Sequence, residues 1–240
     1  MSESARGILY LIPSPLGDTP PLEVLPLSVK KKVEELNHFI IENEKAARRF
    51  IKKITPNKNQ DGLLLYPLNK FTSFEEIESY LDPCLNGESM GLMSDAGTPG
   101  IADPGALIVS KAHKIGVKVK PLAGPSSLIL AMMSSGMNGQ SFAFNGYLPV
   151  DQKLRKQAIQ KFEKKATRES QSQLFIETPY RSLTLFKDLL NTLLPSTLLC
   201  IACDLTLSTE YIMTLSIKDW KKEKPQLEKR PCIFIIEAGF

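Results

Sequence analysis

The residues whose types and spacing could do chemistry are concentrated in one loop, residues 94–105, with the sequence SDAGTPGIADPG. It holds three glycines, two prolines and two aspartates. Glycine lets the backbone approach a ligand closely, and proline removes conformational freedom. The aspartates add carboxylate acceptors. The loop therefore predicts a site for a small polar ligand, and an ordinary turn with several special dihedral angles is the alternative.

The loop follows an apolar run at 90–93, which predicts a buried strand, and precedes a predicted helix at 106–115. In α/β proteins ligands bind most often at such strand-to-helix junctions. A second loop, residues 13–18, follows the predicted strand 8–12, and in a parallel sheet both loops would lie at one edge. A third loop, residues 121–127, would add to this site the hydroxyls of two serines and the backbone amides of a helix N-terminus.

Strand and helix patterns alternate in the first half of the chain, which predicts a largely parallel, helix-flanked sheet. In the second half some strands follow one another with no helix between them, which predicts a mixed sheet. We therefore expect an α/β protein of two domains, residues 1–120 and 121–240. The predicted strands are 8–12, 39–42, 63–66, 91–94, 117–121, 142–147, 173–178, 198–203, 211–215 and 232–237. The predicted helices are 28–37, 45–54, 74–81, 106–115, 128–135, 152–167 and 180–194.

Composition is that of a globular protein with a core: 240 residues, 42% hydrophobic and 23% charged. No apolar run reaches the roughly 18 residues that a membrane span needs, and the first residues do not resemble a signal peptide. We therefore expect a cytoplasmic protein with no membrane partner. The net charge of +4 does not by itself require a nucleic acid.

Basic residues are nevertheless clustered. Residues 30–58 carry nine basic and four acidic residues, and residues 153–168 carry seven basic and one acidic. Such runs either face phosphates or form solvated helix faces, and the second interpretation is the more common one.

The four cysteines give no zinc pattern, because Cys200 and Cys203 form a CxxC spacing without a second pair. Both lie in a predicted strand, where residues three apart point to opposite faces. We expect buried, reduced thiols and no metal site.

Several common chemistries are unsupported. No GxGxxG follows the first strand, and GxxxxGK[ST] and HExxH are both missing. Neither His38 nor His113 lies beside a nucleophile elbow. An enzyme built on this chain would lack a hydrolytic triad and a metal.

The loop at 94–105, followed by GPSS at 124–127, closely resembles the tetrapyrrole methylase superfamily. That resemblance implies an S-adenosylmethionine-dependent methyltransferase that binds its cofactor in a cleft between two α/β domains. The sequences IPSPLGD, GYLP and FIETPYR elsewhere in the chain resemble one branch in particular. These are the bacterial ribosomal RNA ribose 2′-O-methyltransferases that act on a small-subunit cytidine. The likeness covers residues 8–238.

The resemblance implies a set of cofactor contacts: Pro13, Leu16, Asp95, Gly97, Thr98, Ile101, Ser126, Ser127 and Ala238. Asp95 would fix the loop or bind a polar part of the cofactor, and the two serines would bind its polar end. Related proteins are homodimers, so a homodimer is expected.

Two acceptor-side segments depart from the branch. Its Glu-Asp-Thr-Arg run corresponds here to residues 42–45, of which only Glu42 is kept, and its histidine-bearing stretch corresponds to residues 66–70, which have no histidine. Glu42 is the one candidate for a general base. For Glu42 and Asn69 the alternative is a polar residue that shapes a turn at a strand end.

The predicted function is methyl transfer to ribosomal RNA or the small ribosomal subunit. Carbon methylation of a tetrapyrrole is the alternative acceptor chemistry. A further alternative is a protein that binds the cofactor but has lost transfer activity.

Overall fold

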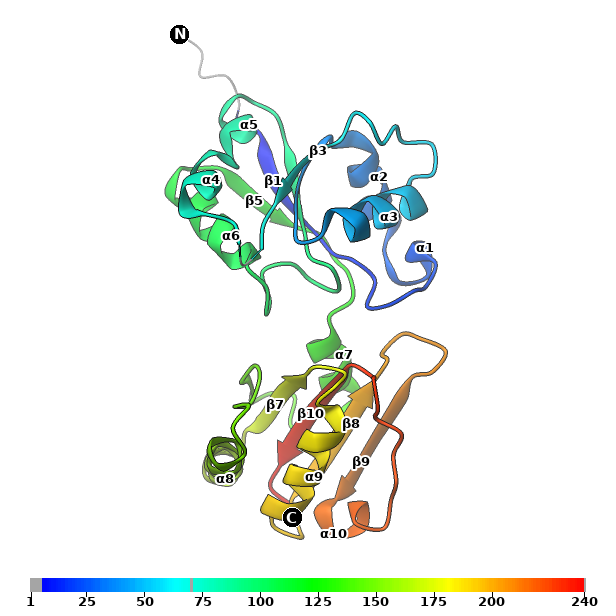
Figure 1. Cartoon of the computed structure of the whole chain (residues 1–240), viewed down its shortest axis with the longest axis vertical. Helices are drawn as coiled ribbons and strands as arrows, with labels where there is room; N and C mark the ends of the chain where they lie inside the picture. The colour runs from blue at the N-terminus through cyan, green and yellow to red at the C-terminus, as the bar shows by residue number, and fades with distance from the viewer. Residues whose placement is uncertain (1–5, 70, 240) are drawn as a thin grey trace. The chain divides into compact units, whose positions relative to one another are not determined.

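The computed structural model describes residues 6–69 and 71–239. The chain divides into two compact units, Met1–Ser126 and Ser127–Phe240 (Figure 1). The division falls between Ser126 and Ser127.

The first unit is built on a five-stranded sheet in the order β3-β2-β4-β1-β5, and every pairing is parallel. The connections that such a sheet requires are supplied by helices. The strands are β1 (Ile8–Ile12), β2 (His38–Ile41), β3 (Leu64–Pro67), β4 (Met90–Met93) and β5 (Lys118–Pro121).

Helices cover both faces of this sheet, since alternate residues of the central strands are buried on opposite sides. Tyr10 and Ile12 belong to one apolar cluster, with α2 and α3, and Leu9 belongs to another, with α5 and α6 (Figure 1). The helices are α1 (Pro21–Val24), α2 (Leu27–Glu35), α3 (Glu44–Ile54), α4 (Phe74–Ser79), α5 (Asp82–Leu85) and α6 (Gly105–Lys114).

The second unit has a mixed sheet in the order β6-β7-β10-β8-β9. Only β6 and β7 pair in parallel, and the other three pairings are antiparallel. The strands are β6 (Phe142–Phe144), β7 (Ser172–Glu177), β8 (Leu198–Cys203), β9 (Tyr211–Ser216) and β10 (Cys232–Glu237).

One face of this sheet packs against α8 and α9 in a cluster that includes Ile159, Phe175 and Leu189. Trp220 is fully buried there, and its ring N–H donates to the carbonyl of Leu199 at 2.7 Å. The helices are α7 (Ser127–Ser135), α8 (Gln152–Glu169), α9 (Ser182–Thr192) and α10 (Ile217–Trp220).

The expected α/β class, with a parallel first sheet and a mixed second sheet, is confirmed. The sequence does not predict α1, α5 or α10. Each has four residues, which is little more than one turn, so no 3.6-residue periodicity can appear.

The prediction that all four cysteines are reduced is wrong for two of them. Cys203 and Cys232 lie opposite each other on antiparallel strands β8 and β10, with Cα atoms 4.4 Å apart, and form a disulfide. Sequence spacing could not reveal this pair, because the register of two strands 29 residues apart brings it together. Cys84 and Cys200 are free and buried. Burial raises the pKa of the Cys84 thiol to about 11.

Among the described residues, no helix combines the length and apolarity needed to cross a membrane.

Candidate functional site

Two of the predicted loops are joined at the carboxyl ends of neighbouring strands. β1 and β4 pair in parallel as far as Ile12 and Met93, and the loops that follow them continue side by side. Ser14 and Gly97 form an isolated antiparallel bridge: the Ser14 N–H donates to the Gly97 carbonyl at 2.8 Å, and the Gly97 N–H donates back at 3.0 Å. The Ser14 hydroxyl also donates to the Ser94 carbonyl at 2.9 Å. The sequence-predicted loops therefore form one backbone-lined surface.

Gly97 is required at this junction. Its φ of +74° is in the left-handed region, which costs a residue with a Cβ about 1–2 kcal/mol. A Cβ added there would lie 3.2 Å from Cδ2 of Leu16. Two predicted cofactor residues, Leu16 and Gly97, are thus in contact.

The third loop packs against the first. The Leu122 N–H donates to the Leu11 carbonyl at 3.0 Å. Gly124 then lies directly on Pro13, since a Cβ on Gly124 would come within 2.3 Å of Cγ of that proline. Ser126, two residues further, ends the first unit.

Three carboxylates hold the loops in place. Glu42 follows β2 and accepts the Asp95 N–H at 3.1 Å, while the Asp95 carboxylate accepts the Asn43 N–H. Burial raises the pKa of the Glu42 carboxyl, and the charges of Asp103 and Asp95 raise it further. Partial burial also raises the pKa of Asp95.

Asp103 shapes the loop from within. Its carboxylate accepts the N–H groups of Gly100 at 2.9 Å and of Gly105 at 2.7 Å. Burial raises its pKa, and these hydrogen bonds oppose the rise. Sequence reasoning did not assign Asp103 a role, although its place before Pro104-Gly105, at the start of α6, is typical of a loop-closing aspartate.

A pocket of about 260 Å³ opens beside the joined loops. Its wall includes Leu16 and Asp95 from the predicted set, together with Arg49 and Lys53 from α3. Lys53 pairs with Asp18 at 2.5 Å, which lowers the pKa of that carboxyl. Arg49, Phe50 and Lys53 were not predicted as site residues, although the basic run at 30–58 was the signal that pointed to α3.

Glu42 does not line that pocket. It borders a separate space of about 10 Å³, together with Ser14, Ser94 and Asp95. Such a space holds about one water molecule. Glu42 shapes the loop through its contact with the Asp95 N–H, and its role as a base stays a prediction.

The other predicted residues are dispersed. Thr98 is half-buried in the loop, and the Ile101 side chain is 53% exposed. Ser127 begins α7 and Ala238 follows β10, so both belong to the second unit. Asn69 forms a turn, since its side chain accepts the N–H of Phe71 at 2.9 Å.

Solved structures with the same fold include methyltransferases. The methyltransferase CobJ superimposes with a TM-score of 0.63 at 15% identity, covering 97% of this chain and 94% of that one. A uroporphyrin-III C-methyltransferase from Thermus thermophilus, complexed with S-adenosylhomocysteine, superimposes with a TM-score of 0.58 at 15% identity. The superposition covers 96% of this chain and 97% of that one. The fold is therefore that of the tetrapyrrole methylases.

Curated relatives identify the family within that fold. The ribosomal RNA small subunit methyltransferase I of Buchnera aphidicola is 30% identical in an alignment that covers 100% of this chain and 81% of the relative. The enzyme of the same name from Vibrio cholerae is 28% identical, and the alignment covers 96% of this chain and 77% of the relative. No family model matches the chain. The chain belongs to the ribosomal RNA small subunit methyltransferase I family and is a methyltransferase, which confirms the resemblance found in the sequence.

Proposed function

We propose that this protein transfers a methyl group from S-adenosylmethionine to a ribose 2′-hydroxyl of small-subunit ribosomal RNA, at a cytidine. The observation that carries the proposal is the pocket beside the Ser14–Gly97 bridge. It combines predicted cofactor residues with two cations suited to phosphate. The names of the curated relatives support the RNA acceptor.

The cofactor fits the donor set of the joined loops. Their surface offers backbone groups, apolar Pro13 and Leu16, and the carboxylate of Asp95. S-adenosylmethionine supplies a methyl group that its sulfonium already makes electrophilic. A carboxylate and backbone carbonyls suit such a cation. Ser126 and Ser127 precede and begin α7, whose N-terminal amides favour a carboxylate.

The α3 side of the pocket suits an anionic acceptor. Arg49 and Lys53 would repel a sulfonium but attract phosphate, because each bound phosphate releases condensed counterions. These two side chains therefore hold the RNA backbone, and position accounts for most of the catalysis.

Glu42 is proposed as the general base that accepts the ribose hydroxyl proton through a water molecule in the space that it borders. Its raised pKa makes the carboxylate a better proton acceptor than an ordinary glutamate. The resemblance assigns cofactor contacts to both domains, which we place at residues 1–120 and 121–240. It also suggests a cytoplasmic location and a homodimer. Light scattering of the purified protein would test the homodimer.

The direct test is an assay with radiolabelled S-adenosylmethionine and small ribosomal subunits from cells that lack this methylation. We expect label in the RNA, at the 2′-oxygen of a cytidine. Label in a tetrapyrrole instead would support the alternative acceptor. Cofactor binding with no transfer to either acceptor would mean that the protein binds without catalysis.

A further inference from the structure

Helix α8 carries an unbalanced charge. It contains seven basic residues and two acidic ones. One of each points inward: Arg155 is 5% exposed and pairs with Asp188 at 2.6 Å, and Glu163 is 9% exposed and accepts the Leu194 N–H at 2.8 Å. The remaining six cations therefore share the outer surface of α8 with a single carboxylate, Glu169.

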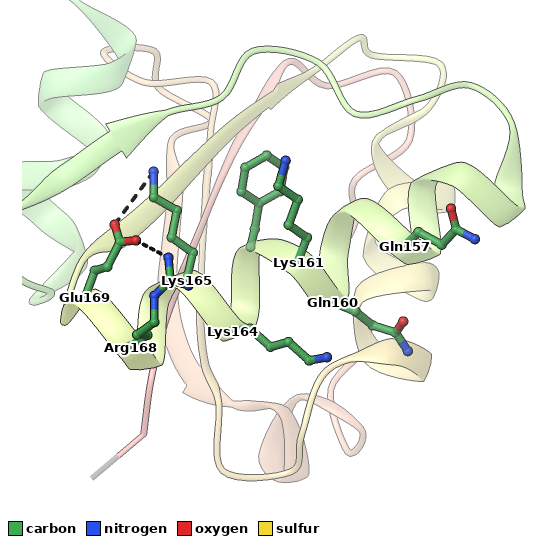
Figure 2. A pocket seen from close by; sticks show the side chains of 8 residues that line it. Gln157, Gln160, Lys161, Lys164, Lys165, Arg168 and Glu169 are labelled. Atoms are coloured by element: carbon green, nitrogen blue, oxygen red, sulfur yellow. Dashed lines mark hydrogen bonds and ion pairs between the residues drawn. The ribbon is translucent and has the colours of Figure 1, made fainter.

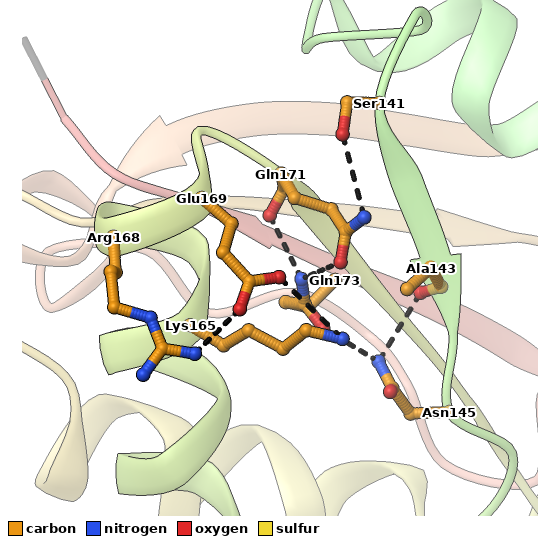
Figure 3. A network of polar contacts seen from close by, with 8 residues as sticks. All are labelled: Ser141, Ala143, Asn145, Lys165, Arg168, Glu169, Gln171 and Gln173. Atoms are coloured by element: carbon orange, nitrogen blue, oxygen red, sulfur yellow. Dashed lines mark hydrogen bonds and ion pairs between the residues drawn. The ribbon is translucent and has the colours of Figure 1, made fainter.

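Glu169 neutralises little of this charge. It pairs with Arg168 at 2.6 Å and with Lys165 at 3.9 Å, and Figure 3 shows its carboxylate between those two side chains. Within residues 6–69 and 71–239, Lys161 and Lys164 have no carboxylate at ion-pair distance. The neighbouring network of Gln171, Gln173, Asn145 and Ser141 contributes amides and a hydroxyl, and it adds no charge (Figure 3).

The charged residues of α8 are not spaced in the way that stabilises a helix. A glutamate four residues before a lysine stabilises a helix, and a like charge there destabilises it. The residues four before Lys161 and Lys164 are the neutral Gln157 and Gln160. The residues four before Lys165 and Arg168 are Lys161 and Lys164 themselves.

Other helices of the same chain do use such pairs. In α2, Lys30 pairs with Glu34 at 3.7 Å, and in α3, Arg48 pairs with Glu44 at 2.8 Å. Among the described residues, α8 shows one such pair, Lys165 with Glu169 at 3.9 Å, for its six outward-facing cations. An ordinary solvated helix face would be expected to pair Lys161 and Lys164 in the same way. A face that repels itself in the free protein is stabilised by an anion, because the anion removes the repulsion.

We propose that α8 binds the phosphate backbone of RNA through one face, formed by Gln157, Gln160, Lys161, Lys164, Lys165 and Arg168. This face, called the α8 face below, lines a broad hollow of about 720 Å³ (Figure 2). Its four cations lie within residues 161–168, or roughly 10 Å of helix, which is enough for successive phosphates. The two glutamines supply amide groups for riboses. The inference rests on the proposed function, which requires an RNA partner.

The sharpest test changes charge in a direction that helps the helix. The double substitution Gln157→Glu, Gln160→Glu places a glutamate four residues before Lys161 and Lys164. We expect a higher Tm because of the new pairs. Affinity for a fluorescein-labelled single-stranded RNA should fall by about tenfold, since two negative charges enter a phosphate site. A higher Tm with unchanged RNA affinity would overturn the proposal.

A second variant removes cations. For Lys161→Gln, Lys164→Gln, Arg168→Gln we expect the slope of log affinity against log salt, between about 50 and 200 mM, to be smaller by about 2. The matched control is Lys218→Gln, Lys221→Gln, Lys224→Gln, which removes the same charge from exposed positions in the same unit. An equal effect in the control would contradict the proposal. So would competition by polyglutamate as strong as that by unlabelled RNA.

Failure of this inference and failure of the proposed function are distinguishable. If the wild type binds RNA and methylates it, but the variants bind as tightly as the control, only the α8 face is wrong. If the wild type binds no RNA, the RNA acceptor is wrong as well. A Tm shift with S-adenosylmethionine that is equal in wild type and variants shows that the variants keep the fold.

Discussion

The side chain of Glu42 accepts the backbone N–H of Asp95 at 3.1 Å, and the Asp95 carboxylate in turn accepts the N–H of Asn43, the residue next to Glu42. This exchange ties the loop after β2 to the loop after β4. Burial raises the pKa of both carboxyls, and the charges of Asp103 and Asp95 raise that of Glu42 further. The geometry of the site is therefore maintained at an electrostatic cost.

The Glu42→Gln variant should be more stable than the wild type, because it removes the charge of this carboxylate. Glutamine keeps an oxygen for the Asp95 N–H but carries no charge. A raised carboxyl pKa means that the folded state disfavours the ionised form, so stability is lost as pH rises through the folded pKa. We therefore expect the variant to have the higher Tm at pH 7.

The difference should vanish below the ordinary glutamate pKa of 4.5, where the carboxyl is protonated in both states. Calorimetric scans of both proteins across this pH range provide the measurement. If Glu42 is the base, the variant also loses about 10²–10⁴-fold in kcat while its cofactor affinity is unchanged. Full activity of Glu42→Gln would leave Glu42 with the loop-shaping role alone.

The substitution Gly97→Ala should lower both the stability of the protein and its affinity for the cofactor. We expect about 1–2 kcal/mol of destabilisation from the positive φ. The contact at 3.2 Å should also displace Leu16 and weaken S-adenosylmethionine binding.

The matched control is Gly136→Ala, where φ is +71° and an added Cβ would meet nothing within 4 Å. It should lose similar stability and keep cofactor affinity, as measured by calorimetric titration. Equal cofactor affinity in the two variants would argue against a role for the Leu16–Gly97 contact.

The substitutions Arg49→Gln and Lys53→Gln should weaken RNA binding more than they lower kcat. Each removes a cation from the pocket, so we expect a several-fold higher KM for small subunits at similar kcat. The salt slope should fall by about one per cation. Lys52→Gln is the control, because Lys52 is exposed, bonds the Pro56 carbonyl at 2.7 Å and does not line the pocket. A lower kcat with unchanged KM would contradict this assignment.

The disulfide predicts sensitivity to reductant. Closing a loop across a sequence separation of 29 should contribute about 3.5 kcal/mol in the chain-entropy account. We expect dithiothreitol to lower the Tm of the wild type but not of a Cys203→Ala, Cys232→Ala variant. Thiol titration in denaturant without reductant should find two free thiols of the four cysteines. Four free thiols would show that the pair is reduced.

The sequence predicts most of this fold because its signals are local. Glycine, proline and aspartate mark the loop at 94–105, and a short apolar run marks strands such as β1. The Cys203–Cys232 pair depends on β-strand register, and no local pattern contains that information. The same limit applies to Gly124, whose need for glycine arises only where it packs on Pro13.

The candidate site follows the same division. The resemblance identified Leu16, Asp95 and Gly97, and the structure brings them together through the Ser14–Gly97 bridge. Arg49 and Lys53 were visible only as part of a basic run. Their direction depends on how α3 packs, with Ile51 and Ile54 buried and the cations outward.

Cofactor binding can be measured separately. Saturation with S-adenosylmethionine at about a hundred times its dissociation constant should add about 2.7 kcal/mol of stability. For a chain of this size that is a rise of roughly 5–10 °C in Tm. The rise should be lost in Asp95→Ala, Ser126→Ala. No rise in the wild type would contradict the cofactor assignment.

The most direct test of the central claim is the position of the transferred methyl group. Unmethylated small ribosomal subunits would be incubated with the protein and labelled S-adenosylmethionine, and the RNA would be digested and its nucleosides identified. We expect label in 2′-O-methylcytidine. Label on a base, or none in the RNA despite bound cofactor, would contradict it.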